Sequence, residues 1–250
     1  MRKKILAASI ALAIVAGVTA MAQRNNMAAP SNGTPFDEDL IITDMQHANP
    51  GDVPDVTVKE TGYKNAPATG THRGHGYVDL GLSVCWATAN VGERSGDSGS
   101  VLAWGMTKGP AGGDYSERNC DSYGVARSDI SGNINLDAAA KDWGGNWRMP
   151  TKAEMQELRN NCTWVWVTSP IMGYKVTSKK NGRHIYLPAW GRFVGKSGIE
   201  YHKSGYYWTS TPCNNGAHTS AYRLDFSSRG TNLLEGNRRD GCFIRPVLRK

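Results

Sequence analysis

The chain has 250 residues with a formal net charge of +7, and 39% of its residues are hydrophobic. Beyond the first 22 residues, no apolar run approaches the length of a membrane-spanning helix, which excludes a helical membrane protein with several spans. The roughly 180 residues after position 70 are enough to bury a core without disulfide bonds.

The N-terminus has the pattern of a secretory signal peptide. Basic residues precede an apolar run from Ile5 to Val18, and small residues follow it up to Ala22. The run is short for a transmembrane anchor, so we expect cleavage between Ala22 and Gln23. No cysteine lies at the end of the run, so we expect no lipid at the new N-terminus. The sequence therefore predicts an exported protein that is periplasmic, secreted or associated with the cell surface, with no transmembrane segment after cleavage.

Charge is unevenly distributed along the chain. Residues 23–70 contain three basic and seven acidic residues and have the composition of a flexible acidic tether. Residues 71–250 contain 23 basic against 15 acidic residues, a balance that suits anionic glycans, membrane surfaces or nucleic acid. The basic residues are scattered, with short clusters only at Lys179–Lys180 and Arg238–Arg239. We therefore interpret this charge as solvated surface and expect no nucleic-acid partner.

The first part of residues 71–250 predicts short strands, a long loop and two helices. Residues 76–80, 82–87 and 101–104 are expected to be strands, and residues 107–135 a loop. A short helix is expected over 136–143. A second helix follows Thr151, which forms a capping box with Glu154 and places Met155 and Leu158 on one face.

Beyond residue 163 the chain is expected to be almost wholly β. Residues 174–178 and 183–187 flank Asn181-Gly182, the strongest local signal for a hairpin. Further strands are expected at 205–211, 220–226 and 241–247, with Tyr222, Leu224 and Phe226 on one face of the second of these. Helices early and antiparallel strands late predict an α+β domain.

Ordered sequence blocks carry a resemblance to a known family. They include Tyr-Val-Asp-Leu-Gly-Leu-Ser-Val-Cys-Trp-Ala at 77–87, Trp-Gly-Gly-Asn-Trp-Arg-Met-Pro at 143–150, Gly-Tyr-Tyr-Trp-Thr-Ser-Thr at 205–211 and Gly-Cys-Phe-Ile-Arg-Pro-Val at 241–247. Over about residues 72–248, the chain resembles the Fibrobacter succinogenes major paralogous domain. The resemblance implies a C-type-lectin-like fold of two helices, a mostly antiparallel sheet and long loops, found on exported adhesion modules of Bacteroidetes-type bacteria.

The same resemblance implies what the domain does not do. The Glu-Pro-Asn, Gln-Pro-Asp and Trp-Asn-Asp triplets of calcium-dependent lectins do not occur in the sequence, so neither calcium-mediated sugar binding nor a metal site is expected. Formylglycine-generating enzymes share the fold but need reactive cysteines in their own sequence context, which is missing here. We expect no cofactor and no catalytic residues.

Cysteines, tryptophans and histidines can have either structural or functional roles in this chain. Five cysteines in an exported chain permit at most two disulfide bonds, with pairing left open (Cys85, Cys120, Cys162, Cys213 and Cys242). Four tryptophans within the family blocks are expected in the core: Trp86, Trp104, Trp147 and Trp208. Trp190 is instead the best candidate for an exposed indole that stacks on a sugar. His72 and His75 are interpreted as loop residues.

Two polar segments, 212–220 and 227–240, are the expected recognition loops, because binding residues concentrate on loops between strands. The predicted ligand-binding residues are Trp190, Asn214, Asn215, His218, Arg223, Arg229, Asn232, Asn237 and Arg238.

The sequence thus favours a non-catalytic binding or adhesion module for an unknown protein or glycan. Two alternatives remain open: a receptor diversified by a retroelement, which the arrangement of the C-terminal blocks also resembles, and an enzyme of unknown type on the same scaffold.

Overall fold

The computed structural model describes residues 67–94 and 97–250. The predicted signal peptide, its cleavage site at Ala22 and Gln23, and nearly all of the predicted tether lie outside the described residues. Within the described part, no helix is long and apolar enough to cross a membrane.

Five short strands form the first sheet, in the order β1 (Gly70–His72), β2 (His75–Val78), β3 (Val84–Ala87), β13 (Val247–Arg249) and β4 (Trp147–Arg148). Every neighbouring pair is antiparallel. The strands expected at 76–80 and 82–87 are confirmed with shorter bounds. The histidines predicted to lie in a loop are instead paired residues of a hairpin, His72 in β1 and His75 in β2.

Both predicted helices are present. The first, α3 (Ala138–Asp142), begins after Asp137, whose carboxylate accepts hydrogen bonds from the amides of Ala139 and Ala140. The second, α4 (Lys152–Asn161), begins with the predicted capping box, in which Thr151 and Glu154 each accept a backbone N–H of the other. The predicted loop at 107–135 is irregular apart from two 3-10 turns, η1 (Ala111–Gly113) and η2 (Glu117–Asn119).

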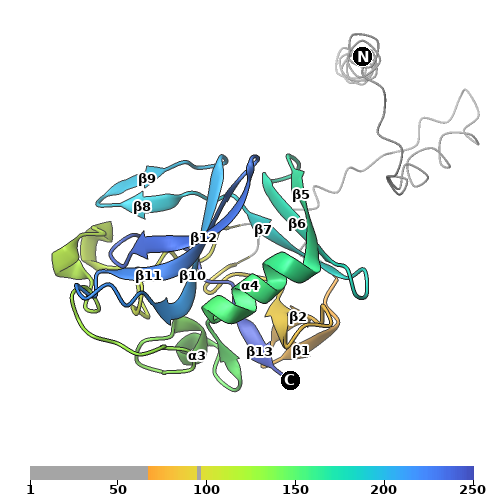
Figure 1. Ribbon diagram of the computed structural model, residues 1–250, viewed down its shortest axis with the longest axis horizontal. Helices are drawn as coiled ribbons and strands as arrows, with labels where there is room; N and C mark the ends of the chain where they lie inside the picture. Colours follow the sequence, from red (N-terminus) through yellow and green to blue (C-terminus); the bar gives the residue numbers. More distant parts are fainter. Residues whose placement is uncertain (1–66, 95–96) are drawn as a thin grey trace, which may run out of the picture. The chain divides into compact units, whose positions relative to one another are not determined.

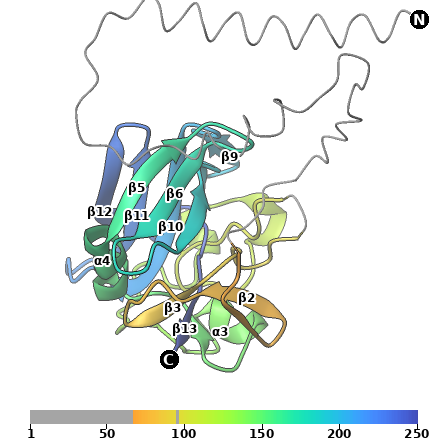
Figure 2. The ribbon, with the colours of Figure 1, turned by 90° about the vertical axis from the view of Figure 1, so that its right-hand side faces the viewer.

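A hairpin sheet follows α4, made of β5 (Cys162–Val167), β6 (Gly173–Ser178) and β7 (His184–Pro188), and then a small hairpin of β8 (Arg192–Val194) and β9 (Ser197–Ile199). The β6–β7 turn confirms the prediction made from Asn181-Gly182, because Gly182 adopts the positive φ of 73° that such a turn favours. In Figures 1 and 2, α3 and the sheet holding β2 and β13 lie at one end of the described residues, and β5, β6 and β9 lie toward the other.

The C-terminal sheet contains β10 (Ser204–Pro212), β11 (Ser220–Ser227) and β12 (Gly230–Asn237). The prediction that residues 227–240 form a loop is wrong over β12. This segment lacks the apolar alternation of a half-buried strand, but its backbone pairs with β11 along its whole length as an edge strand.

Two other predicted strands are reduced to isolated bridges. The strand predicted at 101–104 forms one bridge, between Leu102 and Cys242. Of the strand predicted at 241–247, Val247 lies in β13, and the earlier residues form that bridge and single bridges at Phe193–Gly241 and Tyr207–Phe243. The described residues thus form an α+β fold of two α-helices and mostly antiparallel strands.

The four tryptophans expected in the core are all buried, each at most 1% exposed. Three of their indole N–H groups donate to backbone carbonyls, those of His72, Leu102 and Thr209. All five cysteines are buried free thiols, so no disulfide bond reinforces this core.

Candidate functional site

The outer face of the C-terminal sheet gathers the most prominent group of charged side chains. Because side chains alternate along a strand, Tyr207, Leu224 and Phe226 face one core cluster, whereas Tyr206 and Trp208 pack in a second cluster on the opposite side of the sheet. Tyr206, Arg223 and Asp225 point to the opposite face, where the register places Tyr206 beside Asp225 and Asp225 beside Asn232.

Four charged side chains on this face form a chain of ion pairs, which we call the charge ladder. Its members, in order along the chain of contacts, are Arg192, Asp240, Arg223 and Asp225. The Oδ2 atom of Asp240 accepts from an Nη1 atom of Arg192 at 2.9 Å and of Arg223 at 2.8 Å. Arg223 then binds both carboxylate oxygens of Asp225, at 2.8 and 3.2 Å. A two-oxygen contact of this kind fixes both planar groups in one orientation.

The ladder is rigid and only partly open to solvent. The side chains of Arg223 and Asp240 are 6% and 7% exposed, whereas those of Asp225 and Arg192 are 19% and 23% exposed. Its outer members, Asp225 and Arg192, are therefore the ones that solvent reaches. The ring of Tyr206 lies beneath both arginines, with its centroid 4.7 Å from the guanidinium carbon of Arg192 and 5.0 Å from that of Arg223.

A glycine makes room for the central arginine. A Cβ atom at Gly236 of β12 would lie 2.6 Å from Cδ of Arg223, closer than real side chains pack. Burial raises the pKa of the neighbouring Cys242 thiol to about 12, so a protonated thiol faces the guanidinium rather than a reactive thiolate. The centre of the ladder is thus built to hold Arg223 in place.

A shallow hollow of about 140 Å³ lies beside the ladder, lined by residues of all three strands that include Tyr206, Asp225 and Asn232. Leu234 lies next to Arg223 across the strands and is 49% exposed. The face therefore offers an amide, a carboxylate and an aliphatic side chain close together.

The structure sorts the predicted ligand-binding residues by their exposure. Four are exposed: Asn214, Asn215, Arg229 and Asn232. His218 and Asn237 are half-buried, and the remaining three, Trp190, Arg223 and Arg238, are buried. Asn232 alone among the nine lines the hollow, while Arg223 supports it from within the ladder.

Arg238 is a structural residue rather than part of a recognition loop. Its side chain is fully buried, and its guanidinium donates to the backbone carbonyls of Ser122, Val125 and Ser220. A buried charge is stable only when its donors are satisfied, and these carbonyls satisfy most of them. The sequence prediction was wrong because an arginine in a polar segment looks the same whether it points inward or outward.

Trp190 is not the exposed indole that the sequence predicted. It is 8% exposed, because Tyr201 stacks on it with the ring centroids 5.3 Å apart. Tyr201 is itself 55% exposed and lies between Glu200 and His202, which both adopt a positive φ. The solvent-facing aromatic in this region is therefore a tyrosine.

Sequence reasoning missed several members of the site: Arg192, Glu200, Tyr206 and Asp240. Glu200 accepts a hydrogen bond from the Tyr206 hydroxyl, which connects the turn around Tyr201 to the ladder. The alternation in 205–211 could have placed Tyr206 on the outer face. Arg192 and Asp240 reach the face from separate segments, which no local pattern indicates.

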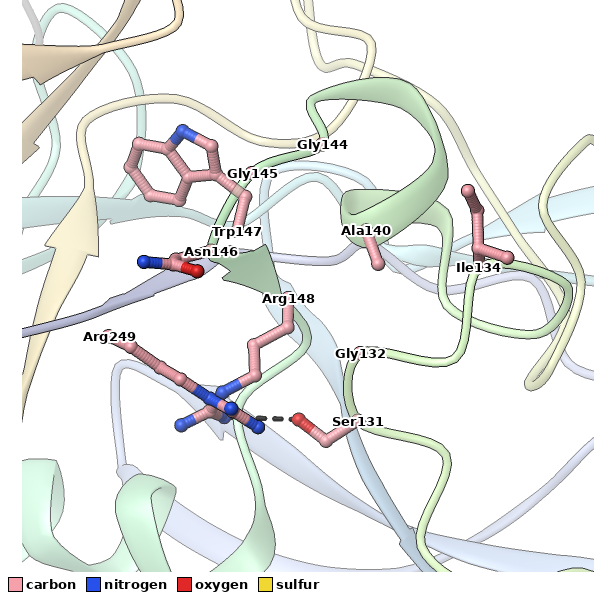
Figure 3. A pocket seen from close by; sticks show the side chains of 10 residues that line it. All are labelled: Ser131, Gly132, Ile134, Ala140, Gly144, Gly145, Asn146, Trp147, Arg148 and Arg249. Carbon is pink, nitrogen blue, oxygen red and sulfur yellow. Dashed lines mark hydrogen bonds between the residues drawn. The ribbon is translucent and has the colours of Figure 1, made fainter.

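A second hollow, of about 300 Å³, lies against α3 and the first sheet. Figure 3 shows Arg148 of β4 and Arg249 of β13 extending toward Ser131, with Asn146 and Trp147 on another side. Arg148 donates to the Ser131 hydroxyl at 3.0 Å and forms an ion pair with Glu154. No residue of the C-terminal sheet lines this hollow.

Neither hollow contains an evident metal site. In residues 67–94 and 97–250, no three His, Cys, Asp or Glu side chains lie close enough together to hold a metal ion. His75 is stacked on Trp143 with the ring centroids 3.7 Å apart, and burial lowers its pKa.

Comparison with known proteins gives no family for this chain, since no family model, curated protein or solved structure matches it.

Proposed function

We propose that this chain is an exported binding module that recognises a protein or glycan through the outer face of β10, β11 and β12. The charge ladder carries this proposal. Its inner members are fixed by packing and ion pairs; the outer member Asp225 lies beside the exposed Asn232, and the exposed Leu234 lies beside the inner Arg223. Polar and apolar groups held rigidly on a sheet lose little conformational freedom when a partner binds.

We further propose that the domain has the C-type-lectin-like fold of the Fibrobacter succinogenes major paralogous domain. The two helices, the mostly antiparallel strands and the long irregular segment between β3 and α3 support this assignment. The proposal also extends to a non-catalytic role. Asp225 and Asp240 are both held by guanidinium groups, an arrangement that suits support of a surface better than transfer of a proton.

The binding face is tested by changing an exposed side chain that supports no fold contact. Leu234→Arg places a bulky charge on the edge strand β12, beside Arg223 of the charge ladder, while Val165→Arg makes the same change at a 46% exposed valine on β5. Both full-length variants and the parent chain are applied to an array of glycans and cell-surface proteins. We expect Leu234→Arg to lose the ligands that the parent chain captures and Val165→Arg to keep them.

Failure of the parent chain to capture any ligand would contradict a binding role, and equal loss in both variants would place the binding face elsewhere. Export is tested separately, by expressing the full chain in a bacterial host and measuring the mass of the product. A mature N-terminus at Gln23 supports export, and retention of residues 1–22 argues against it.

A further inference from the structure

We propose that the hollow between α3 and the first sheet binds an acidic sugar residue, that is, a polyhydroxylated ring carrying one carboxylate. This site shares no residue with the face of the C-terminal sheet, so the proposal does not depend on the function proposed above. The inference rests on the charge of the lining, on unused hydrogen-bond donors and on the size of the hollow.

The lining carries two cations and no carboxylate. Arg148 and Arg249 both line the hollow, and their guanidinium groups both extend toward Ser131 in Figure 3. Glu154 neutralises Arg148 through a contact with two nitrogen atoms, at 2.8 and 2.5 Å. Arg249 is exposed, and its guanidinium makes no hydrogen bond or ion pair to any side chain in the described part of the chain. One uncompensated positive charge therefore faces the hollow, which favours an anion.

Several donors at the hollow are unused. The backbone N–H groups of Gly144, Gly145 and Asn146 have no acceptor among the hydrogen bonds of residues 67–94 and 97–250. Both glycines adopt a positive φ, of 63° and 60°, so the backbone passes the hollow without side chains. Figure 3 places residues 144–146 on another side of the hollow from the two guanidinium groups, so the guanidinium groups are the donors to a carboxylate and the backbone N–H groups are donors to the ring hydroxyls.

The size and the neutral part of the lining favour a sugar acid over a simple inorganic ion. The hollow measures about 300 Å³, at the lower end of the range for small-molecule sites. Asn146 offers an amide to ring hydroxyls, while Ile134 and Ala140 supply apolar contacts for ring carbons.

The experiment titrates the ¹⁵N-labelled full-length chain with sodium glucuronate and follows the amide signals of residues 144–146 by NMR. Glucose serves as the neutral counterpart, and sodium sulfate and sodium phosphate represent simple anions. We expect saturable shifts with glucuronate and none of comparable size with glucose. Arg249→Gln should weaken glucuronate binding about tenfold or more, because it removes the uncompensated charge. Asn146→Asp should weaken it as strongly by repulsion.

Arg127→Gln is the matched control, since Arg127 is exposed and does not line the hollow. It should bind glucuronate as the parent chain does. The proposal is overturned if glucose shifts the same signals equally, or if Arg127→Gln weakens binding as much as Arg249→Gln. It is also overturned if sulfate or phosphate saturates the site while glucuronate does not, which would leave a site for inorganic anions. All three substitutions lie at exposed positions, so loss of folding does not obscure the result.

Discussion

The guanidinium carbon of Arg238 lies 4.2 Å from the centre of the Trp104 ring, with both side chains fully buried. Three backbone carbonyls accept from the same guanidinium, two of them in the segment before α3 and one at the start of β11. One side chain thereby ties an irregular segment to the C-terminal sheet, which explains how residues 120–126 are fixed without regular structure.

Replacing this arginine is expected to destabilise the fold strongly. Arg238→Gln removes the guanidinium that donates to three carbonyls, of which the Val125 carbonyl has no other donor in the described residues, and it removes the contact with Trp104. We therefore expect a loss of about 2–4 kcal/mol in the free energy of unfolding. Chemical denaturation monitored by tryptophan fluorescence measures it. Arg239→Gln, at a neighbouring arginine whose side chain is 35% exposed and paired with Glu117, should cost less than about 1 kcal/mol. Equal losses in the two variants would refute the role of Arg238.

The carboxylate of Asp137 organises the start of α3 and the chain on either side of it. Its Oδ1 atom accepts from Ala139 and Ala140, and its Oδ2 atom accepts from Gly132 and Met149. Asp137→Asn turns an NH₂ group toward two backbone N–H donors in either orientation of the amide. We expect it to cost about 2–3 kcal/mol, more than the loss of an ordinary cap. Thermal denaturation checks this, and the exposed Asp142→Asn should leave the melting temperature nearly unchanged.

Stability should fall in acid partly through Glu154. Burial raises the pKa of this carboxyl, but hydrogen bonds from Arg148 and Thr151 outweigh burial and hold it below its ordinary value of 4.5. A lowered pKa in the folded state contributes stability that is fully present above pH 4.5 and is lost as the pH falls through the folded value. The difference in unfolding free energy between the parent chain and Glu154→Gln should therefore be large at pH 7 and shrink below pH 4.

Urea denaturation at a series of pH values measures this difference. Glu235→Gln, an exposed change on β12, is the control and should differ little from the parent chain throughout. A difference for Glu154→Gln that stays constant down to pH 3 would contradict the assignment.

The five thiols should be unreactive in the folded chain and fully reactive after unfolding. All are buried, and burial raises the pKa of Cys162 and of Cys213 to about 11, so little thiolate is present at neutral pH. Titration with a thiol reagent should count five thiols in denaturant and almost none without it. A count of three or one in denaturant would reveal disulfide bonds that the structure does not contain.

Local signals in the sequence predicted the elements whose causes are local. The capping box of Thr151 and Glu154 and the turn at Asn181-Gly182 depend on residues within a few positions, and both are confirmed. The edge strand β12 was missed because its partner β11, rather than its own pattern, makes it a strand.

The candidate site was predicted only in part, for the same physical reason. Asn232 was found from its polar segment, but the direction of Arg238 and the cover that Tyr201 places over Trp190 depend on contacts between distant segments. The charge ladder joins residues from β8, β11 and the segment after β12, so it exists only in the folded chain.

The place of β13 in the first sheet has a consequence for how the molecule is made. Residues 247–249 pair with β3 on one side and β4 on the other, so β3 has only β2 beside it and β4 has no partner strand until residues 247–249 have been synthesised. Pairings this distant along the chain form late and slowly. A nascent chain that cannot close its first sheet stays open for longer, and an open chain is the form that the export proposed above requires.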